Sequence, residues 1–245
     1  KFDQYFAELA RKAGAIIHLQ HSFVRKEGNN LIIKDIKHKQ ELKLTPEIVI
    51  AADGPLSKVA HAYGFYYPQR QNYYGIQAIV EGKFNPKRYQ TFFGREVCPD
   101  LFGWIVPESK TKARLGVASR KDAKKWFDEF IKKHDFKIKE MQAGVIPLYH
   151  PQQKLQKDNC YLIGDASGFV KATTLGGIIP GLTQAELLAD CITRGKDYEK
   201  AIKPLRKRMN LHLQLRRIFD KFKDKDWDRL IYLLGKPKMQ QLLQQ

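Results

Sequence analysis

The stretch Tyr161-Leu-Ile-Gly-Asp-Ala-Ser-Gly-Phe-Val-Lys-Ala-Thr-Thr-Leu-Gly-Gly-Ile-Ile-Pro-Gly-Leu182 decides the fold. It opens on a short apolar run, Cys160–Ile163, which predicts a buried strand. A Gly-Asp pair follows, and further glycines precede a helix that we expect to begin near position 178. Glycine lets backbone approach a ligand closely, and an acidic side chain at the carboxyl end of a strand is well placed to bind a ribose hydroxyl. The candidate cofactor-binding residues are Gly164, Asp165, Gly168, Gly176, Gly177 and Ile178. An ordinary strand–loop–helix crossover has the same outline.

A second segment, Glu47-Ile-Val-Ile-Ala-Ala-Asp-Gly-Pro-Leu-Ser-Lys-Val59, has the same order of strand, Asp-Gly turn and helix. Asp53 and Gly54 stand where the strand ends, and Ser57 lies in the turn that leads into the helix. Asp-Gly is a common turn dipeptide, so this segment alone is weak evidence for a cofactor site. Asp53 and Gly54 are the two candidates that it contributes.

Together, in this order and about a hundred residues apart, the two segments resemble the second and third FAD fingerprints of the flavoprotein hydroxylase-like fold. Within that fold, the chain is similar to the geranylgeranyl reductase family, whose members include digeranylgeranylglycerophospholipid reductases. The sequence Gly164–Lys171 is close to the one typical of the family, and Phe102–Pro107 resembles its Tyr-x-Trp-x-Phe-Pro substrate motif. The resemblance covers nearly the whole chain.

The chain departs from the family pattern at several points. Leu175 stands where the family usually has glycine, Phe102 replaces the tyrosine of the substrate motif, and Val106 replaces its phenylalanine. The Gly-x-Gly-x-x-Gly fingerprint, which should come first in such proteins, is absent from the sequence. The chain begins with Lys1 on a helical pattern instead. We therefore expect that the amino-terminal FAD-binding segment is missing from this chain.

The resemblance implies a role for each candidate. Asp165 would accept hydrogen bonds from flavin ribityl or ribose hydroxyls, while a turn or helix-cap role is the alternative. Gly176, Gly177 and Ile178 would present N–H groups to the flavin at a helix start, where the helix dipole favours negative charge. Asp53 and its glycine would shape the turn beside the cofactor, although a plain turn fits them almost equally well.

The substrate motif contributes Phe102, Trp104 and Pro107. Phe102 and Trp104 alternate along a strand, so both rings point to one face. They would form a flat apolar wall over an isoprenoid chain, and Pro107 would end the strand. Core aromatic residues of a sheet would show the same alternation.

The expected fold class is α/β with α+β elements, in which an antiparallel sheet is inserted into an incomplete Rossmann-like FAD-binding domain. We expect residues 1–66 and 151–195 to form the FAD-binding part, 67–150 the antiparallel substrate domain, and 196–245 a basic helical region. Gly28-Asn29-Asn30 predicts a hairpin. The expected strands are 15–19, 31–36, 41–44, 48–51, 73–80, 89–93, 103–106, 113–118 and 145–147, and the expected helices are 3–14 and 121–134.

Length and composition fit this reading. The chain has 245 residues, of which 43% are hydrophobic, which is enough for a core. No run of 18 apolar residues occurs, so the sequence predicts no membrane span. Cys98, Cys160 and Cys191 are widely spaced and show no metal-binding or redox spacing. We expect reduced cysteines, with Cys160 and Cys191 in the core.

The formal charge is +18, and half of the excess lies in residues 194–245, with 15 Lys and Arg against 6 Asp and Glu. Leu211, Leu215, Ile218 and Phe222 predict one apolar stripe on this tail. The basic faces predict either a solvated surface or attraction to anionic lipid. We therefore expect a cytoplasmic protein that can bind the inner face of the membrane. No recognition motif for nucleic acid accompanies the charge.

The sequence favours an FAD-dependent reductase of carbon–carbon double bonds in isoprenoid lipids, with reduced nicotinamide or ferredoxin as the electron source. No residue stands out as the proton donor, and no metal site is expected. A flavin-dependent monooxygenase or halogenase on the same scaffold is the first alternative, since Trp104–Pro107 partly overlaps the halogenase motif. A cofactor-free remnant that binds acidic surfaces is the second.

Overall fold

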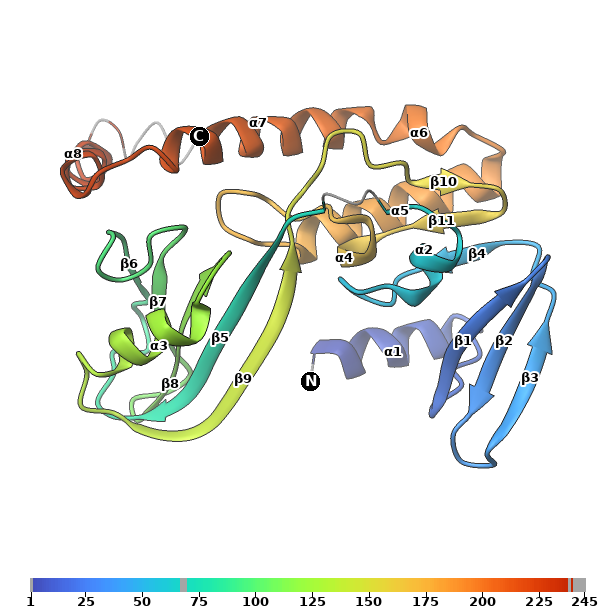
Figure 1. The fold of residues 1–245 in the computed structure, drawn as a ribbon, viewed down its shortest axis with the longest axis horizontal. Helices are drawn as coiled ribbons and strands as arrows, with labels where there is room; N and C mark the ends of the chain where they lie inside the picture. The colour runs from blue at the N-terminus through green and yellow to red at the C-terminus, as the bar shows by residue number, and fades with distance from the viewer. Residues whose placement is uncertain (1, 67–69, 238, 240–245) are drawn as a thin grey trace.

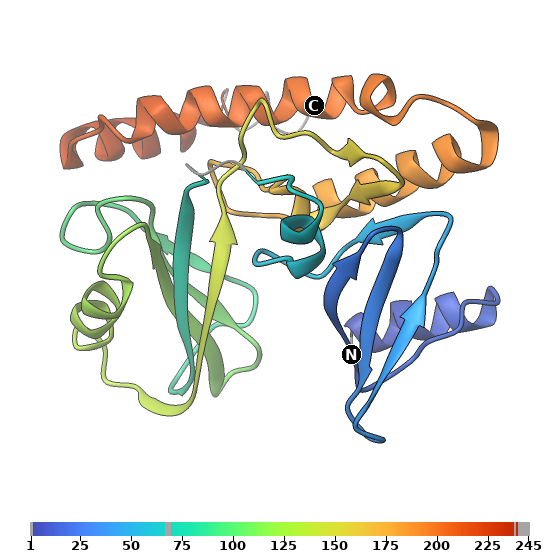
Figure 2. The same ribbon diagram turned by 45° about the vertical axis from the view of Figure 1, so that its right-hand side comes forward.

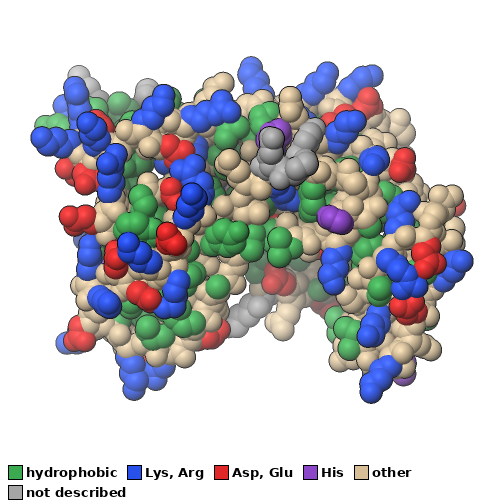
Figure 3. All heavy atoms as spheres, in the orientation of Figure 1, with side chains coloured by type: hydrophobic (Ala, Val, Ile, Leu, Met, Phe, Trp, Pro, Cys, Tyr) green, Lys and Arg blue, Asp and Glu red, His purple; other side chains and the backbone are tan. Residues whose placement is uncertain are grey.

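Two β-rich lobes lie beneath a layer of helices (Figures 1 and 2). The computed structural model describes residues 2–66, 70–237 and 239. Between the lobes, short strands and helices join them to the helical layer. The space-filling view shows an open gap between the lower ends of the two lobes (Figure 3). The mixed α/β architecture agrees with the predicted fold class.

The amino-terminal lobe contains a three-stranded antiparallel sheet with the order β1-β2-β3. Its strands are β1 (His21–Glu27), β2 (Asn30–Asp35) and β3 (Gln40–Leu44), and helix α1 (Phe2–Lys12) precedes them. The turn between β1 and β2 contains Gly28 at a φ of +58°, a conformation that glycine adopts at little cost. The predicted hairpin and the predicted first helix are therefore confirmed.

The strand predicted at 15–19 is wrong. This segment has no regular structure, and the strand that pairs with β2 begins two residues later at His21. Ile16 and Leu19 are 83% and 75% exposed, so these apolar side chains do not enter the core. Helix α1 likewise has no buried residue, although its apolar side chains follow a helical period.

The central layer holds a small sheet with the order β10-β11-β4, formed by β10 (Gln156–Lys157), β11 (Cys160–Leu162) and β4 (Val49–Ala51). Strands β4 and β11 are parallel, although more than a hundred residues separate them along the chain. Each is followed by a short helix, α2 (Lys58–Ala62) after β4 and α4 (Gly164–Ser167) after β11. The topology therefore places the two Asp-Gly and Gly-Asp turns at the same edge of one sheet.

The second lobe is a five-stranded antiparallel sheet with the order β6-β7-β8-β5-β9. Its strands are β5 (Asn72–Glu81), β6 (Gln90–Phe92), β7 (Gly103–Pro107), β8 (Lys112–Ser119) and β9 (Lys137–Pro147). Helix α3 (Ala123–Ile131) covers one face, where Phe127 and Phe130 pack on Ile105 and Leu115. The predicted strands of this lobe are confirmed, but the last one is much longer than the expected 145–147.

The upper layer is formed by α5 (Ile178–Arg194), α6 (Tyr198–Ala201) and α7 (Lys203–Phe219), and α8 (Asp224–Leu234) follows at its end. The described part of the chain has no helix that is long and apolar enough to cross a membrane. The predicted stripe is wrong in part, because Leu211 and Ile218 are exposed. The buried side of α7 is two positions out of phase with the predicted stripe and consists of Leu205, Met209, Leu213 and Arg216.

Cys98, Cys160 and Cys191 are all free and buried, and burial was predicted for Cys160 and Cys191. Cys160 and Cys191 belong to the central core cluster with Leu162, Leu188 and Tyr198. Burial raises the pKa of Cys160 to about 12, so this thiol stays protonated and unreactive at neutral pH.

The end of β2 supports a prediction about pH. The carboxylate of Asp35 accepts a hydrogen bond from the His38 backbone N–H (3.1 Å) and lies 2.6 Å from His38 Nδ1, with His21 Nε2 at 3.8 Å. The bond to His38 lowers the pKa of Asp35 from 3.8 to about 2. This lowered pKa contributes stability that is present above pH 4 and is lost as the pH falls towards 2.

We therefore expect the Asp35→Asn variant to unfold at a lower temperature than the wild type at pH 6, and the difference to shrink progressively between pH 4 and pH 2. Thermal unfolding followed by circular dichroism at several pH values measures it. A difference that is constant over this range would show that the carboxylate charge contributes nothing.

Candidate functional site

The two candidate turns meet at the carboxyl ends of β4 and β11. Ala51 pairs with Leu162, and the Ile163 N–H donates to the Ala51 carbonyl over 3.1 Å. Gly54 and Gly164 have φ values of +85° and +59°, and no atom lies where a β-carbon on either would reach. In open α/β sheets, ligands bind beyond the carboxyl ends of parallel strands. The structure thus brings together the two segments that sequence analysis paired.

Helix α5 approaches the Gly164 turn very closely. A β-carbon on Gly181 would lie 3.3 Å from Gly164 Cα, and one on Gly177 would lie 2.7 Å from Asp165 Oδ1. Glycine at both positions lets the start of α5 rest directly on the turn. The Asp165 carboxylate therefore lies against the amino-terminal end of this helix, where unpaired N–H groups and the helix dipole favour an anion.

Asp165 is half-buried, and burial raises the pKa of its carboxyl group, which Arg70 opposes by lowering it. Arg70 Nη2 also donates to the Asp165 carbonyl over 2.8 Å, and its guanidinium lies 4.3 Å from the centre of the Tyr66 ring. Within the described ranges, no protein donor hydrogen-bonds the carboxylate itself. Asp165 is thus held by its backbone, and its side chain keeps its acceptor capacity for a ligand.

Gln184 on α5 holds the same turn through hydrogen bonds. Its Oε1 accepts the Gly164 N–H over 2.9 Å and lies 2.9 Å from the Ser167 hydroxyl, which is also 2.6 Å from the Gly164 carbonyl. Gln184 is fully buried, and its Nε2 has no hydrogen-bond partner among the residues that the structure describes. Sequence analysis missed both Gln184 and Arg70. A glutamine spaced with Pro180, Leu188 and Cys191 on the buried side of α5 is the signal that could have found the first.

The loop between α4 and α5 folds back on itself. The Leu175 N–H donates to the Lys171 carbonyl over 2.8 Å, and the Lys171 N–H donates to the Gly176 carbonyl over 3.2 Å. Leu175 has a φ of +55°, so the leucine that departs from the family's usual glycine occupies a left-handed conformation. Its side chain packs against a buried cluster of Tyr73, Cys98, Leu101 and Ala118, and Phe102 and Trp104 pack against the same cluster. The loop that leaves the Asp165 turn and the substrate motif therefore share this buried cluster.

The Asp53 carboxylate is already engaged by hydrogen bonds within its own turn. Its carboxylate accepts hydrogen bonds from the Ser57 hydroxyl and, over 3.3 Å, from the Val59 N–H, while Ser57 caps α2 through the Ala60 N–H. Asp53 therefore anchors the start of α2, and a contact with a cofactor stays a prediction for this residue and for Gly54.

The substrate motif lies on β7, and its rings share the face opposite to α3. The centres of Phe102 and Trp104 are 6.2 Å apart with the rings inclined at 73°, and the Trp104 ring covers Gly116, where a β-carbon would lie 2.5 Å from it. Pro107 stands two positions after Ile105 on the strand, and residues two apart point to the same face. Pro107 therefore lies on the α3 side, as Ile105 does. The structure therefore brings together two of the three substrate candidates and separates Pro107 from them.

The wall that carries these rings is not purely apolar. The Trp104 indole N–H points to Gln77 Oε1 at 3.4 Å, and Gln77 Nε2 donates to Gln142 Oε1 over 2.7 Å. Arg114 Nη1 donates to the same Gln142 oxygen over 3.0 Å. These side chains occupy neighbouring strands in register, so one ordered row crosses the sheet from the tryptophan to β9.

The described residues fit a flavin dinucleotide. A carboxylate at a strand end, a turn glycine (Gly164) with open space beside it, the start of α5, and a buried amide with an unpartnered donor all lie around one turn. Such groups bind hydroxyl and carbonyl functions and stabilise negative charge. The residues suited to this are Gly164, Asp165, Gly168, Gly176, Gly177 and Ile178, as predicted, and their contact with a cofactor stays a prediction. No group of His, Cys, Asp or Glu side chains that could hold a metal ion occurs in the described ranges.

The chain is similar in sequence to named reductases. The digeranylgeranylglycerophospholipid reductase of Methanocaldococcus jannaschii is 27% identical over 96% of the chain, and the second such reductase of Methanothermobacter thermautotrophicus is 26% identical over 94%. The chain spans about two thirds of the length of these relatives. No family model matches the sequence.

Solved structures show the same fold. A geranylgeranyl bacteriochlorophyll reductase-like protein from Thermoplasma acidophilum superimposes with a TM-score of 0.85 at 20% identity, covering 96% of this chain and 66% of that one. The flavin-dependent brominase Bmp2 superimposes with a TM-score of 0.70 at 17% identity, covering 99% and 67%. The sequence relatives are named digeranylgeranylglycerophospholipid reductases and a reductase-like protein gives the higher of these two TM-scores, so the chain is most similar, among these proteins, to reductases of the geranylgeranyl reductase family.

Proposed function

We propose that this protein reduces carbon–carbon double bonds in the isoprenoid chains of lipids with FAD as its cofactor. The observation that supports this most is the link between the two halves of the site, because Leu175, in the loop that leaves the Asp165 turn, packs on the same buried cluster as Phe102 and Trp104. A cofactor at the turn and an apolar chain on the aromatic wall would then be neighbours. When bound, reduced FAD would supply a hydride to one carbon of the double bond while a proton adds to its neighbour, with nicotinamide or ferredoxin as the electron source.

The chain's own residues would hold and orient both partners. Asp165 would accept hydrogen bonds from cofactor hydroxyls, and the start of α5 would donate N–H groups through Gly177 and Ile178. Trp104 would present its ring to the isoprenoid chain, and Gln77 would fix the ring's orientation. The aromatic surface also excludes water from the reacting double bond.

Turnover of a geranylgeranyl lipid by the complete protein tests the proposal. With FAD and a reductant under anaerobic conditions, we expect a mass increase of two hydrogens for each reduced double bond. Hydroxylated or halogenated products from an aromatic substrate would favour the monooxygenase or halogenase alternative, which the likeness to a brominase fold keeps open. A complete protein that binds no flavin would favour the cofactor-free alternative.

Trp104 provides the matching variant. We expect Trp104→Ala to lower kcat/KM for a geranylgeranyl lipid roughly tenfold, because the isoprenoid substrate loses its contact with this half-buried ring. Bound flavin should not change, since the ring is absent from the Asp165 turn. Ile138→Ala is the control, because its exposed side chain on β9 lies outside the substrate motif. Unchanged turnover and product pattern with a folded protein would remove Trp104 from the substrate site.

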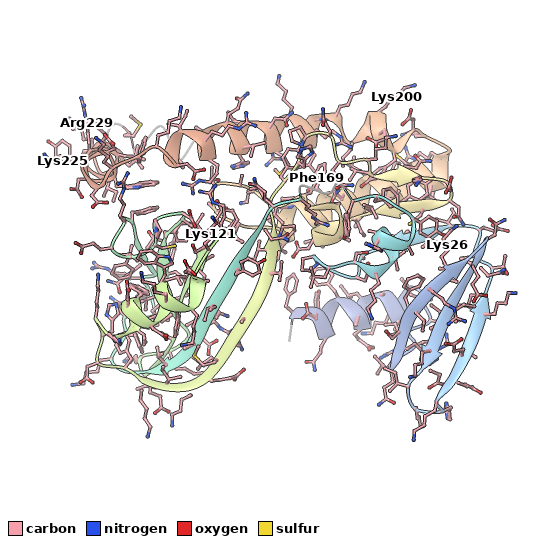
Figure 4. All side chains as sticks on the ribbon, in the orientation of Figure 1. Lys26, Lys121, Phe169, Lys200, Lys225 and Arg229 are labelled. Atoms are coloured by element: carbon pink, nitrogen blue, oxygen red, sulfur yellow. The ribbon has the colours of Figure 1, made fainter. Side chains whose placement is uncertain are left out.

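We further propose that the upper layer binds an anionic membrane surface. Lys200, Lys225 and Arg229 project outward from this layer (Figure 4), and blue side chains cover the same edge in Figure 3. Exposed Leu211, Ile231 and other apolar residues of α7 and α8 accompany them. Each basic residue near an anionic surface contributes about 1 kcal/mol, so co-sedimentation with anionic vesicles should fall steeply with salt.

A further inference from the structure

A cavity lies between the upper end of the five-stranded sheet and α7. It has a volume of about 580 Å³ and is lined from the sheet side by Tyr73, Arg120 and Leu148, and from α7 by Leu213, Arg216 and Asp220. None of these residues belongs to the Asp165 turn. The proposed reductase chemistry therefore leaves this cavity without a role.

Two buried donors line it. The Tyr73 side chain is fully buried, and its hydroxyl has no hydrogen bond with any described residue. Arg216 is 4% exposed; its Nε forms an ion pair with Asp220 Oδ1 at 3.0 Å, but the two are not aligned as a hydrogen bond. A buried donor without an acceptor costs roughly 1–3 kcal/mol, so the Tyr73 hydroxyl favours a ligand with an acceptor oxygen, and the Arg216 guanidinium adds positive charge beside it.

The charge of the lining has the sign that such a ligand needs. Three arginines, Arg120, Arg216 and Arg217, face the cavity, against one carboxylate, Asp220. Asp220 is shared, since it pairs with Arg120 at 3.4 Å as well as with Arg216, and Arg120 reaches Asp100 at 3.0 Å outside the lining. Arg217 has no ion pair within the described ranges. An anion would restore the balance of charge.

The cavity also adjoins the aromatic wall. Tyr73 belongs to the buried cluster on which Phe102, Trp104 and Leu148 pack. Leu148 and Leu213 add apolar surface beside the arginines. A group that is anionic at one end and apolar at the other matches this lining better than a fully polar nucleotide phosphate does.

We propose that this cavity binds the phosphate of the substrate's lipid headgroup, with Tyr73, Arg216 and Arg217 as its donors. The assignment of the phosphate to a lipid rests on the proposed function. The site would hold the head of the lipid while its chain runs to the aromatic wall, so it would select phosphorylated isoprenoid lipids over free prenyl alcohols.

Two variants test the cavity with little risk to the fold. Tyr73→Phe removes only the unpartnered hydroxyl, and Arg217→Gln removes an exposed charge. We expect each to raise the Kd for glycerol phosphate roughly tenfold in calorimetric titrations of the complete protein. Tyr63→Phe and Arg208→Gln are the matched controls, because the first alters a buried tyrosine at α2 and the second removes an equal charge from α7 outside the lining. Neither control should change the Kd.

A second measurement separates this inference from the proposed function. In the reductase assay, Tyr73→Phe and Arg217→Gln should raise KM for a phosphorylated geranylgeranyl lipid and leave KM for geranylgeraniol unchanged. Unchanged Kd and KM in both variants would overturn the headgroup site while leaving the reductase intact. Tighter binding of NADP⁺ than of glycerol phosphate, with the same sensitivity to both variants, would overturn the lipid assignment in favour of a nucleotide. Phosphate binding without any reductase activity would support the anion site and refute the function.

Discussion

Replacing Asp165 by asparagine is expected to stabilise the flavin-free protein at neutral pH and to weaken its hold on FAD. Burial raises the pKa of the Asp165 carboxyl group in the folded state. The folded protein therefore loses stability as the pH rises through the ordinary carboxyl pKa, because the unfolded chain ionises more easily. Asparagine removes this penalty, so the variant should unfold at a higher temperature than the wild type at pH 7, and the two should converge below pH 4.

The same change should cost affinity for the cofactor. Asparagine keeps an acceptor oxygen but loses the charge, and a charge-assisted hydrogen bond contributes about twice as much as a neutral one. The loss is about 1–2 kcal/mol, so the Kd for FAD should rise roughly 5- to 30-fold in a fluorescence titration of the complete protein. Stability and binding thus move in opposite directions.

Asp53→Asn is the informative control, since Asp53 follows β4 as Asp165 follows β11. Its carboxylate is engaged by the Ser57 hydroxyl and the Val59 N–H, so its loss should destabilise the protein instead of stabilising it. If Asp165→Asn lowers stability at pH 7 in the same way, or leaves the Kd for FAD unchanged, Asp165 is a structural turn residue and the cofactor lies elsewhere.

Local signals explain why much of the fold was predictable. The runs before Asp53 and Asp165 are short, apolar and followed by glycines, and both glycine turns have the positive φ that the residue type suggests. The strands of the second lobe also show their periods clearly. The parallel pairing of β4 with β11 was not readable from either segment alone, and the structure supplies it.

The errors arise where tertiary contacts overrule local pattern. Residues 15–19 are as apolar as a buried strand, yet pairing with β2 selects the more polar segment His21–Glu27. On α7, the apolar stripe predicted from the sequence includes Leu211 and Ile218, which are exposed. Arg216 occupies a buried position instead, where it pairs with Asp220. Pro107 was grouped with Trp104 by motif, although the alternation of a strand already separates them.

The site residues that sequence analysis missed act over long separations. Arg70 reaches the Asp165 carbonyl across 95 positions, and Gln184 reaches the Gly164 N–H across 20. Neither residue belongs to a recognised motif, and each only hydrogen-bonds the backbone of the turn. Such supporting residues become visible only when the fold brings their elements together.

Replacing Gln184 by leucine is expected to destabilise the protein by about 1–3 kcal/mol. The Gly164 N–H loses its buried acceptor, and one unpaired buried donor costs about this much, whereas the Ser167 hydroxyl keeps the Gly164 carbonyl as its acceptor. Urea unfolding measures the change. Because Gln184 holds the turn that carries Asp165, the Kd for FAD should rise as well.

Gln153→Leu separates these two effects. Gln153 is the other buried glutamine of the described chain, and its Nε2 donates to the carbonyls of Phe65 and Lys154, away from the Gly164 turn. Its loss should destabilise the protein to a similar degree and leave the Kd for FAD unchanged under conditions where the protein is folded. Equal effects of both variants on FAD binding would mean that Gln184 acts only through global stability. A specific loss in Gln184→Leu would show that the geometry of the Gly164 turn controls cofactor binding.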